Sequence, residues 1–231
     1  MNDYLKGAES FILKYNNYNS TNVDINHSQK QEYLVIQQVT VLHLLLETML
    51  KLSNNCHNPT TIHEIREAVG HFVHQAFIRS PELAHALHLQ TYDRSIIPIM
   101  FKHVESMHIC FEIINTLVNH EQVEKRLFGV ELASHLLSQY GLSKYLPLAH
   151  TCLAKIHELS TTRGNRSVVA ESAALLALQS AVRLGRRFPF LVSEIVRIIH
   201  DMKFVYTSQH ASTSIQSLFE TLVKDHVLQK K

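Results

Sequence analysis

Apolar side chains recur at intervals of three, four and seven residues along most of this chain, and His103 to Gly141 shows the pattern most clearly. The first stripe in this stretch comprises Ile109, Ile113, Leu117 and Val118, and the second comprises Val123, Leu127, Val130 and Leu137. This is the spacing of helices that bury one face. We therefore expect two consecutive amphipathic helices, with Ser106 as the N-cap of the first and Gly141 as a left-handed C-cap of the second.

Similar stripes predict further helices on both sides of this pair. They are expected at about residues 3–15, 31–52, 60–79, 81–89, 95–104, 143–162, 167–185, 189–205 and 211–228. The expected N-caps are Thr60 or Thr61, Ser80 and Ser143, because hydroxyl side chains accept hydrogen bonds from the free amides of a first turn. In the helix at 189–205, the side chains expected to face inward are Leu191, Ile195, Ile198, Met202 and Val205.

These roughly ten helices, with short loops and no convincing alternating strand pattern, predict an all-α fold. Consecutive antiparallel helices form either a HEAT-like α-helical solenoid or an irregular multi-helix bundle. No exact repeat of about 34 or 40 residues is visible, so any repeats are degenerate. Residues 16–30 are rich in Asn and Ser, which compete with the backbone for hydrogen bonds. We expect a polar, partly flexible N-terminal segment at 1–30 and an α-helical scaffold domain at 31–231.

The composition narrows the class of protein further. The 45 % of apolar residues and only six Gly and five Pro are typical of a globular helical chain, not a disordered one. The formal net charge of +2 is too small to imply nucleic-acid binding by itself. Three scattered cysteines without a CxxC pair fit a reducing compartment. The start lacks the pattern of a secretory signal, and no run approaches about 18 apolar residues, so we expect no membrane span.

Histidine pairs are the first candidates for a metal site. The pairs are His71 with His74 and His85 with His88, and further ligands would have to come from Cys56, His57 or Cys110. A spacing of three places two imidazoles on one helix face, but zinc in a structural site needs four ligands. Nothing in the sequence brings these residues together. We therefore expect ordinary surface or boundary histidines and no bound metal or other cofactor.

Catalytic motifs are also missing. HEIRE at residues 63–67 lacks the second histidine of a metalloprotease HExxH motif, and neither a GxSxG elbow nor a nucleotide-binding glycine loop occurs. Cys110 is flanked by apolar residues and is expected to be a small core residue, not a nucleophile. The chain is therefore expected not to be an enzyme, with no catalytic, cofactor-binding or metal-binding residues.

Basic residues are concentrated in the C-terminal half. They are Arg163, Arg166, Arg183, Arg186 and Arg187. One interpretation is a favourable charge at a helix C-terminus together with a solvated face. The alternative is a contact with an acidic partner or an RNA backbone, although Phe188 and Phe190 beside Pro189 suit packing between helices better than base stacking.

Several segments of the sequence resemble one known family. SMHICFEII at residues 106–114, EKRLFGVELASHLL at 124–137 and QYGLSKYL at 139–146 are similar to the C-terminal region of the Integrator complex subunit 2 family. The order of elements upstream, from EIREAVG to SIIPIMFKHV, and RRFPFLVSEIVRIIH downstream resemble the same family. The likeness extends over about residues 31–205 and lies mainly at packing positions.

The resemblance implies a non-catalytic scaffold subunit of the nuclear Integrator complex. It implies a role in small nuclear RNA 3′-end processing and RNA polymerase II transcription termination, with RNA cleavage carried out by separate metallo-β-lactamase-type subunits. The implied partners are other Integrator subunits, subunits 1 and 7 first, with RNA polymerase II contacted indirectly. Members of the family are several times longer, so we expect a fragment or a truncated relative. The alternative function is a helical-repeat module that binds nucleic acid through the C-terminal arginines.

Overall fold

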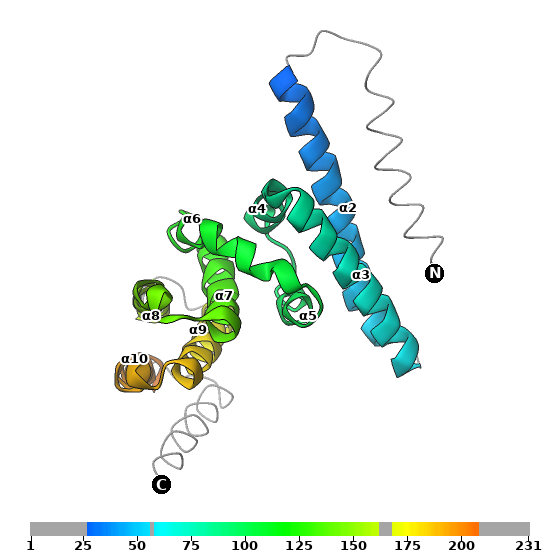
Figure 1. The fold of residues 1–231 in the computed structure, drawn as a ribbon. Helices are drawn as coiled ribbons and strands as arrows, with labels where there is room; N and C mark the ends of the chain where they lie inside the picture. The colour runs from blue at the N-terminus through cyan, green and yellow to red at the C-terminus, as the bar shows by residue number, and fades with distance from the viewer. Residues whose placement is uncertain (1–26, 56–57, 162–167, 208–231) are drawn as a thin grey trace. The chain divides into compact units, whose positions relative to one another are not determined.

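The computed structural model describes residues 27–55, 58–161 and 168–207 (Figure 1). Those ranges contain nine α-helices, three 3-10 helices and no strand, which confirms the all-α prediction. The predicted helices at 3–15 and 211–228, and residues 1–26 of the predicted polar segment, lie outside them. Packing divides the chain into two compact units, residues 1–113 and 114–231. We call these the N-terminal and C-terminal units; the single scaffold domain at 31–231 stays a prediction.

The N-terminal unit is built around two long neighbouring helices. Its elements are α2 (His27–Asn55), α3 (Pro59–Arg79), α4 (Pro81–Gln90), α5 (Ile96–His103) and the 3-10 helix η1 (Glu105–Ile113). α2 begins earlier than predicted, so residues 27–30 are helical. α2 and α3 lie side by side (Figure 1), and α4 and α5 pack against both. The core is formed by Val39, Leu42, Leu46, Met49, Val73, Phe77, Leu87, Ile97 and Met100.

The predicted N-cap of α3 is wrong. Asn58 holds that position in place of Thr60 or Thr61, and its side-chain oxygen accepts a hydrogen bond of 3.1 Å from the amide of Thr60. Pro59 follows as the first helical residue, where a missing amide hydrogen leaves no helical bond unmade. Ser80 does precede α4, but its hydroxyl bonds to no amide of that helix.

The first helix of the predicted central pair is wrong in type. Residues Glu105–Ile113 form a 3-10 helix, and the α-helix that follows, α6, covers only Ile114–Val118. Side chains three apart share a face of a 3-10 helix because it has three residues per turn. The buried side chains follow this interval: Val104, Met107, Cys110 and Ile113. Ile109, predicted to be in the apolar stripe, is half-buried, and Ser106 is buried within η1 and caps no helix.

The C-terminal unit is a stack of longer helices. It contains α6, α7 (Val123–Tyr140), η2 (Ser143–Tyr145), α8 (Leu146–Thr161), α9 (Val168–Arg187), η3 (Pro189–Leu191) and α10 (Val192–Thr207). α7 packs against α8 and α9, α8 packs against α9 and α10, and α9 packs against α10. Contacts with both the next helix and the one after it are the pattern of stacked helical hairpins. This favours the solenoid alternative for the C-terminal unit.

α7 is buried around most of its circumference and not along one stripe. Three of its four predicted stripe residues are buried, but Val123 is 41 % exposed. Also buried are Phe128, Gly129, Glu131, Leu132, Ala133, Ser134 and Leu136. A Cβ at Gly129 would lie 2.7 Å from Cβ of Leu117 and 3.0 Å from the backbone nitrogen of Val118. Glycine is therefore needed where α6 crosses α7.

Gly141 is not the predicted left-handed C-cap, because its φ is −62° and its ψ is 113°. Its small size is needed instead, since a Cβ there would lie 2.9 Å from Cζ of Phe188 and would clash with the carbonyl oxygen of Leu137. Ser143 begins the short helix η2 and does not cap α8. In both places packing, not the preferred chemistry of a helix end, explains the residue.

The inward face of α10 and its lead-in agrees with the prediction. The buried members are Leu191, Ile195, Ile198 and Met202. The side chain of Val205 lies outside the described residues. Phe188 is buried as predicted, whereas Phe190 is 61 % exposed, so packing between helices accounts for one of these two rings.

Candidate functional site

The arrangement closest to a catalytic dyad is a buried cysteine–histidine pair in the N-terminal unit. Sγ of Cys110 lies 3.6 Å from Nε2 and 3.7 Å from Nδ1 of His88, and both side chains are buried. Nδ1 also lies 2.6 Å from the carbonyl oxygen of Ala84. Because a carbonyl can only accept, Nδ1 carries the proton and donates it. Nε2 is then left to accept a hydrogen bond from the thiol.

Burial keeps both groups of this pair neutral. It raises the pKa of Cys110 far above its ordinary value and lowers the pKa of His88 to about 4. In both cases desolvation disfavours the charged form. A catalytic cysteine needs a thiolate near neutral pH and a path for its substrate. The structure places Cys110 in the core, as predicted from its apolar neighbours.

The predicted histidine pairs serve different environments. The rings of His71 and His74 have centroids 6.3 Å apart. Nε2 of His85 lies 3.4 Å from Oε2 of Glu112, whereas His88 is turned into the core. In the part of the chain that the structure describes, no three His, Cys, Asp or Glu residues are grouped to hold a metal ion. Cys56 and His57 lie outside that part, so a protein without bound metal stays a prediction.

Two of the C-terminal arginines hold the C-terminal unit together. Arg183 on α9 donates a hydrogen bond of 2.6 Å to Oγ of Ser134 on α7. Arg187 donates one of 2.9 Å to the carbonyl oxygen of Gly141, just beyond α7. Arg186 is exposed. Outside the described residues lie Arg163 and Arg166. Arg187 is also exposed, so only the engaged Arg183 guanidinium is withheld from phosphate contacts, which weakens the nucleic-acid alternative for that residue.

The Arg183 contact is part of a buried polar cluster between α7 and α9. The hydroxyl of Ser134 donates in turn to the carbonyl oxygen of Glu131 at 2.7 Å. Burial lowers the pKa of Arg183, while the charge of Glu131 opposes this shift. Burial and the neighbouring Arg183 lower the pKa of His135 to about 3, so this imidazole is neutral. The cluster joins two helices of the C-terminal unit.

Two histidine–carboxylate pairs connect α8 and α10. Nδ1 of His150 lies 3.2 Å from Oε2 of Glu194, and Nε2 of His157 lies 3.1 Å from Oδ2 of Asp201. The partners are seven residues apart on each helix, about two turns, so the pairs follow one seam. These polar pairs therefore help to align stacked helices.

α2 has a second apolar face that its neighbours leave exposed. We call it the α2 stripe: Tyr33, Ile36, Thr40, Leu44 and Thr48. The three larger apolar members are 56 %, 47 % and 59 % exposed, respectively. The hydroxyl groups of Thr40 and Thr48 donate to the carbonyl oxygens of Ile36 and Leu44, at 2.9 and 2.7 Å. Because both hydroxyls are turned back to the helix, the stripe presents mainly carbon to its surroundings.

By length and composition alone, the segment Tyr33–Leu52 could cross a membrane, and 22 % of it is buried in the protein. Core helices of soluble proteins pass the same test. The face opposite the α2 stripe packs against α3, α4 and α5, and Glu47 forms an ion pair of 3.0 Å with Lys51. These contacts favour a docked helix with apolar surface left over. The absence of a membrane span stays a prediction.

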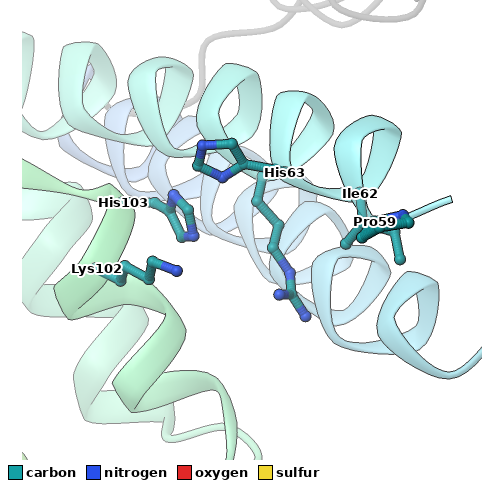
Figure 2. A pocket seen from close by; sticks show the side chains of 6 residues that line it. Pro59, Ile62, His63, Lys102 and His103 are labelled. Carbon is teal, nitrogen blue, oxygen red and sulfur yellow. The ribbon is translucent and has the colours of Figure 1, made fainter.

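A cavity of about 300 Å³ lies between α3 and α5 (Figure 2). Its lining residues are Pro59, Ile62, His63, Arg66, Lys102 and His103. The rings of His63 and His103 approach each other with centroids 5.9 Å apart. In the sequence, residues 63–67 carry only an incomplete protease motif, and nothing marks Lys102 as a neighbour. The cavity could not be foreseen because it depends on how two helices cross.

Comparison with known proteins gives one consistent result. The family described as Integrator complex subunit 2 matches residues 10–211. Integrator complex subunit 2 of Drosophila melanogaster is 30 % identical over 203 residues, covering 86 % of this chain and 18 % of the fly protein. The Dictyostelium discoideum homolog is 27 % identical over 202 residues, covering 78 % of this chain and 15 % of the homolog.

Integrator complex subunit 2 of Homo sapiens is 29 % identical over 153 residues, covering 65 % of this chain and 12 % of the human protein. The chain thus spans less than a fifth of the length of these relatives. The match runs through the helices of both units and agrees with the segments that carry the resemblance in the sequence. The chain belongs to the Integrator complex subunit 2 family.

Proposed function

We propose that this chain is a non-catalytic scaffold segment of the Integrator complex. Membership of the family supports association with other Integrator subunits. The buried and neutral state of Cys110 and His88 supports a structural role for the group that most resembles a catalytic dyad. Through the assembly, the chain would support small nuclear RNA 3′-end processing and RNA polymerase II transcription termination in the nucleus.

The α2 stripe is the observation that carries this proposal. Contiguous apolar surface on a soluble protein marks a site of association. The stripe follows a helix whose other face is fixed in a folded unit, so it offers a rigid surface for a second helical protein. We propose that another Integrator subunit covers it, with subunits 1 and 7 as the first candidates from the family resemblance.

Introducing negative charge into the α2 stripe tests the scaffold role. We expect the double substitution Ile36→Glu with Leu44→Glu to reduce recovery of other Integrator subunits at least tenfold when the tagged chain is purified from its native cells. Two carboxylates would have to lose water against an apolar partner, which costs more than the roughly 1.4 kcal/mol that a tenfold loss represents. Quantitative mass spectrometry of the recovered proteins gives the measurement.

The matched control is Ile78→Glu, because Ile78 on α3 is 53 % exposed but lies outside the α2 stripe. Circular dichroism should show wild-type helix content for both variants. Cross-linking of the unaltered chain should join α2 to subunit 1 or subunit 7. Undiminished recovery with the double variant would refute the α2 stripe as the interface, and recovery of no Integrator subunit by the unaltered chain would refute the scaffold role.

A further inference from the structure

Gly70 makes the cavity between α3 and α5 possible. A Cβ at this position would lie 2.6 Å from Cβ of His103 and would clash with the His103 carbonyl oxygen. Glycine inside a helix is unfavourable compared with alanine, so its presence here is explained by this close crossing. The crossing brings Lys102 and His103, in the last turn of α5, opposite His63 of α3 (Figure 2), and Arg66 of α3 lines the same cavity.

Positive charge is in excess around this cavity. Nε2 of His63 lies 3.3 Å from Oε1 of Glu67, while Lys102 forms no ion pair with any residue that the structure describes. Burial, and then the charges of Lys102, His63 and Arg66, lower the pKa of His103, and Glu67 opposes this effect only in part. Cations that disfavour a further proton in this way would favour an anion in the same space.

The cavity also has an aliphatic side. Pro59 and Ile62, on the same helix as His63 and Arg66, complete the lining. A guanidinium group offers a fork of donors, an ammonium group is a compact charge, and each protonated imidazole adds donors of its own. A tetrahedral oxyanion can accept from several directions at once, whereas a carboxylate offers only two oxygens. The aliphatic residues suit the carbon atoms that carry such an anion, not a stacked aromatic base.

We propose that this cavity binds a phosphate monoester, with Arg66 and Lys102 supplying permanent positive charge and His63 and His103 donating hydrogen bonds. Its volume of about 300 Å³ is at the small end of ligand sites, enough for a phosphoryl group and the side chain that bears it. Free phosphate ligands and phosphorylated side chains of a protein partner share this chemistry. The aliphatic residues favour the phosphorylated side chain. The site goes beyond the scaffold role and does not involve the α2 stripe.

Titration of the full chain with two probes tests the site. The probes are inorganic phosphate and a short phosphoserine peptide with aliphatic neighbours, and the same peptide without phosphate is the blank. We expect saturable changes in the imidazole NMR signals of His63 and His103. Affinity should rise as the pH is lowered while the phosphate keeps its second negative charge, because the His103 imidazole becomes a better donor when it is protonated. Binding should also raise the pKa of His103.

Removal of the permanent charges should weaken binding specifically. We expect Arg66→Gln with Lys102→Gln to weaken phosphate and phosphopeptide binding at least about tenfold, because two charge-assisted interactions are lost. The matched control is Lys144→Gln with Arg186→Gln, which removes the same charge from exposed positions of the C-terminal unit. The control should bind like the unaltered chain.

The outcomes separate the possible ligands. Tighter binding of the phosphopeptide than of inorganic phosphate would identify a protein partner, and equal binding would identify a free phosphate ligand; both support the site. Changes that do not saturate, or that are equal in the two double variants, would overturn it. Stronger binding of a single-stranded RNA at the same histidines would also overturn it. None of these results depends on recovery of Integrator subunits, so this proposal and the scaffold role fail independently.

Discussion

Basic side chains are placed differently in the two units of the chain. In the C-terminal unit they contact other helices: Arg183, Arg187, His150 and His157. In the N-terminal unit they surround an open space: His63, Arg66, Lys102 and His103. Each group of the first set meets an oxygen of the same unit, whereas in the second set Nε2 of His63 lies 3.3 Å from Oε1 of Glu67.

This contrast shows that clustering along the sequence is a poor guide to available charge. The arginines at 183–187 are close in sequence, yet two of them donate to groups on or next to α7. Lys102 and His103 are distant in sequence from His63 and Arg66, yet they share a cavity. Helix packing decides which cationic side chains are engaged, because it places hydrogen-bond acceptors beside some of them and further cations beside others.

Truncation of a large core residue in each unit should cause the largest loss in the free energy of unfolding. Phe77 is 0 % exposed and Phe128 is 1 % exposed, and each change to alanine should lower the free energy of unfolding by about 3–5 kcal/mol. We expect Phe77→Ala to speed thiol labelling of Cys110 and Phe128→Ala to speed that of Cys152. Both cysteines are free and buried, one in each unit, so labelling rates in denaturant, resolved by mass spectrometry, report on the units separately.

The exposed position Val123 provides the control for these truncations, since Val123→Ala should change neither labelling rate appreciably. Independent responses of the two cysteines would show that the units unfold separately. Equal acceleration of both by either phenylalanine substitution would instead support the single domain predicted at 31–231.

Acidification should destabilise the N-terminal unit through His88. Its pKa is about 4 in the folded protein, against about 6.5 for an ordinary histidine. Between these values the unfolded chain binds a proton that the folded chain excludes, so the free energy of unfolding falls as the pH falls, by about 1.4 kcal/mol per pH unit. The loss begins near pH 6.5 and is complete near pH 4, at about 3 kcal/mol.

His88→Leu should flatten this dependence, because it removes the titrating group from an apolar site. Labelling of Cys110 by a disulfide reagent active at acid pH gives the measurement. Cys152 serves as the internal reference, because the acid response of its labelling should be the same in the variant and in the unaltered chain. The C-terminal unit keeps His135 in both, and the pKa of His135 is lowered to about 3 by burial and by Arg183. An unchanged acid response at Cys110 in the variant would assign the effect to other groups.

Replacement of Arg183 and of Arg186 should change the free energy of unfolding by smaller and unequal amounts. Arg183→Met removes the donor to Ser134 and the positive charge near buried Glu131, and should lower the free energy of unfolding by about 2 kcal/mol. Arg186→Met, at an exposed position, should change it by less than about 0.5 kcal/mol. Urea unfolding, monitored through the labelling rate of Cys152, measures both changes in the free energy of unfolding.

The same two variants test the nucleic-acid alternative. Neither should alter the affinity of the chain for RNA at low salt, because Arg183 is engaged within the unit. A fall in salt-sensitive RNA binding without a loss of stability in Arg183→Met would favour the alternative over the internal role.

Regular α-helices were the most predictable part of the fold. The buried side of α10 follows from its spacing of three and four residues, which is a property of one segment. η1 was mistaken for an α-helix because Ile109 and Ile113, four residues apart, fit an α-helical stripe with Leu117. Helix ends were less predictable: Asn58 caps α3 ahead of two threonines, and Gly141 is needed for packing near Phe188, not for a left-handed turn.

Candidate sites were predictable only where one segment contains the information. The apolar neighbours of Cys110 correctly indicated a core position, but they did not show that His88 lies against its thiol. The family resemblance likewise rests on segments of the chain that can be read without coordinates. The partners of Arg183 and the cavity beside His63 join segments far apart, so they required the packed structure.

Helical class, the approximate limits of the helices and the family can therefore be read from the amino-acid order, since periodicity and family segments are local. Packing alone determines which cations remain available. That determination depends on close approaches such as the crossing at Gly70, where the absence of one Cβ lets α5 bring Lys102 and His103 to face α3. The energy of such a crossing belongs to both helices together, and neither segment reveals it alone.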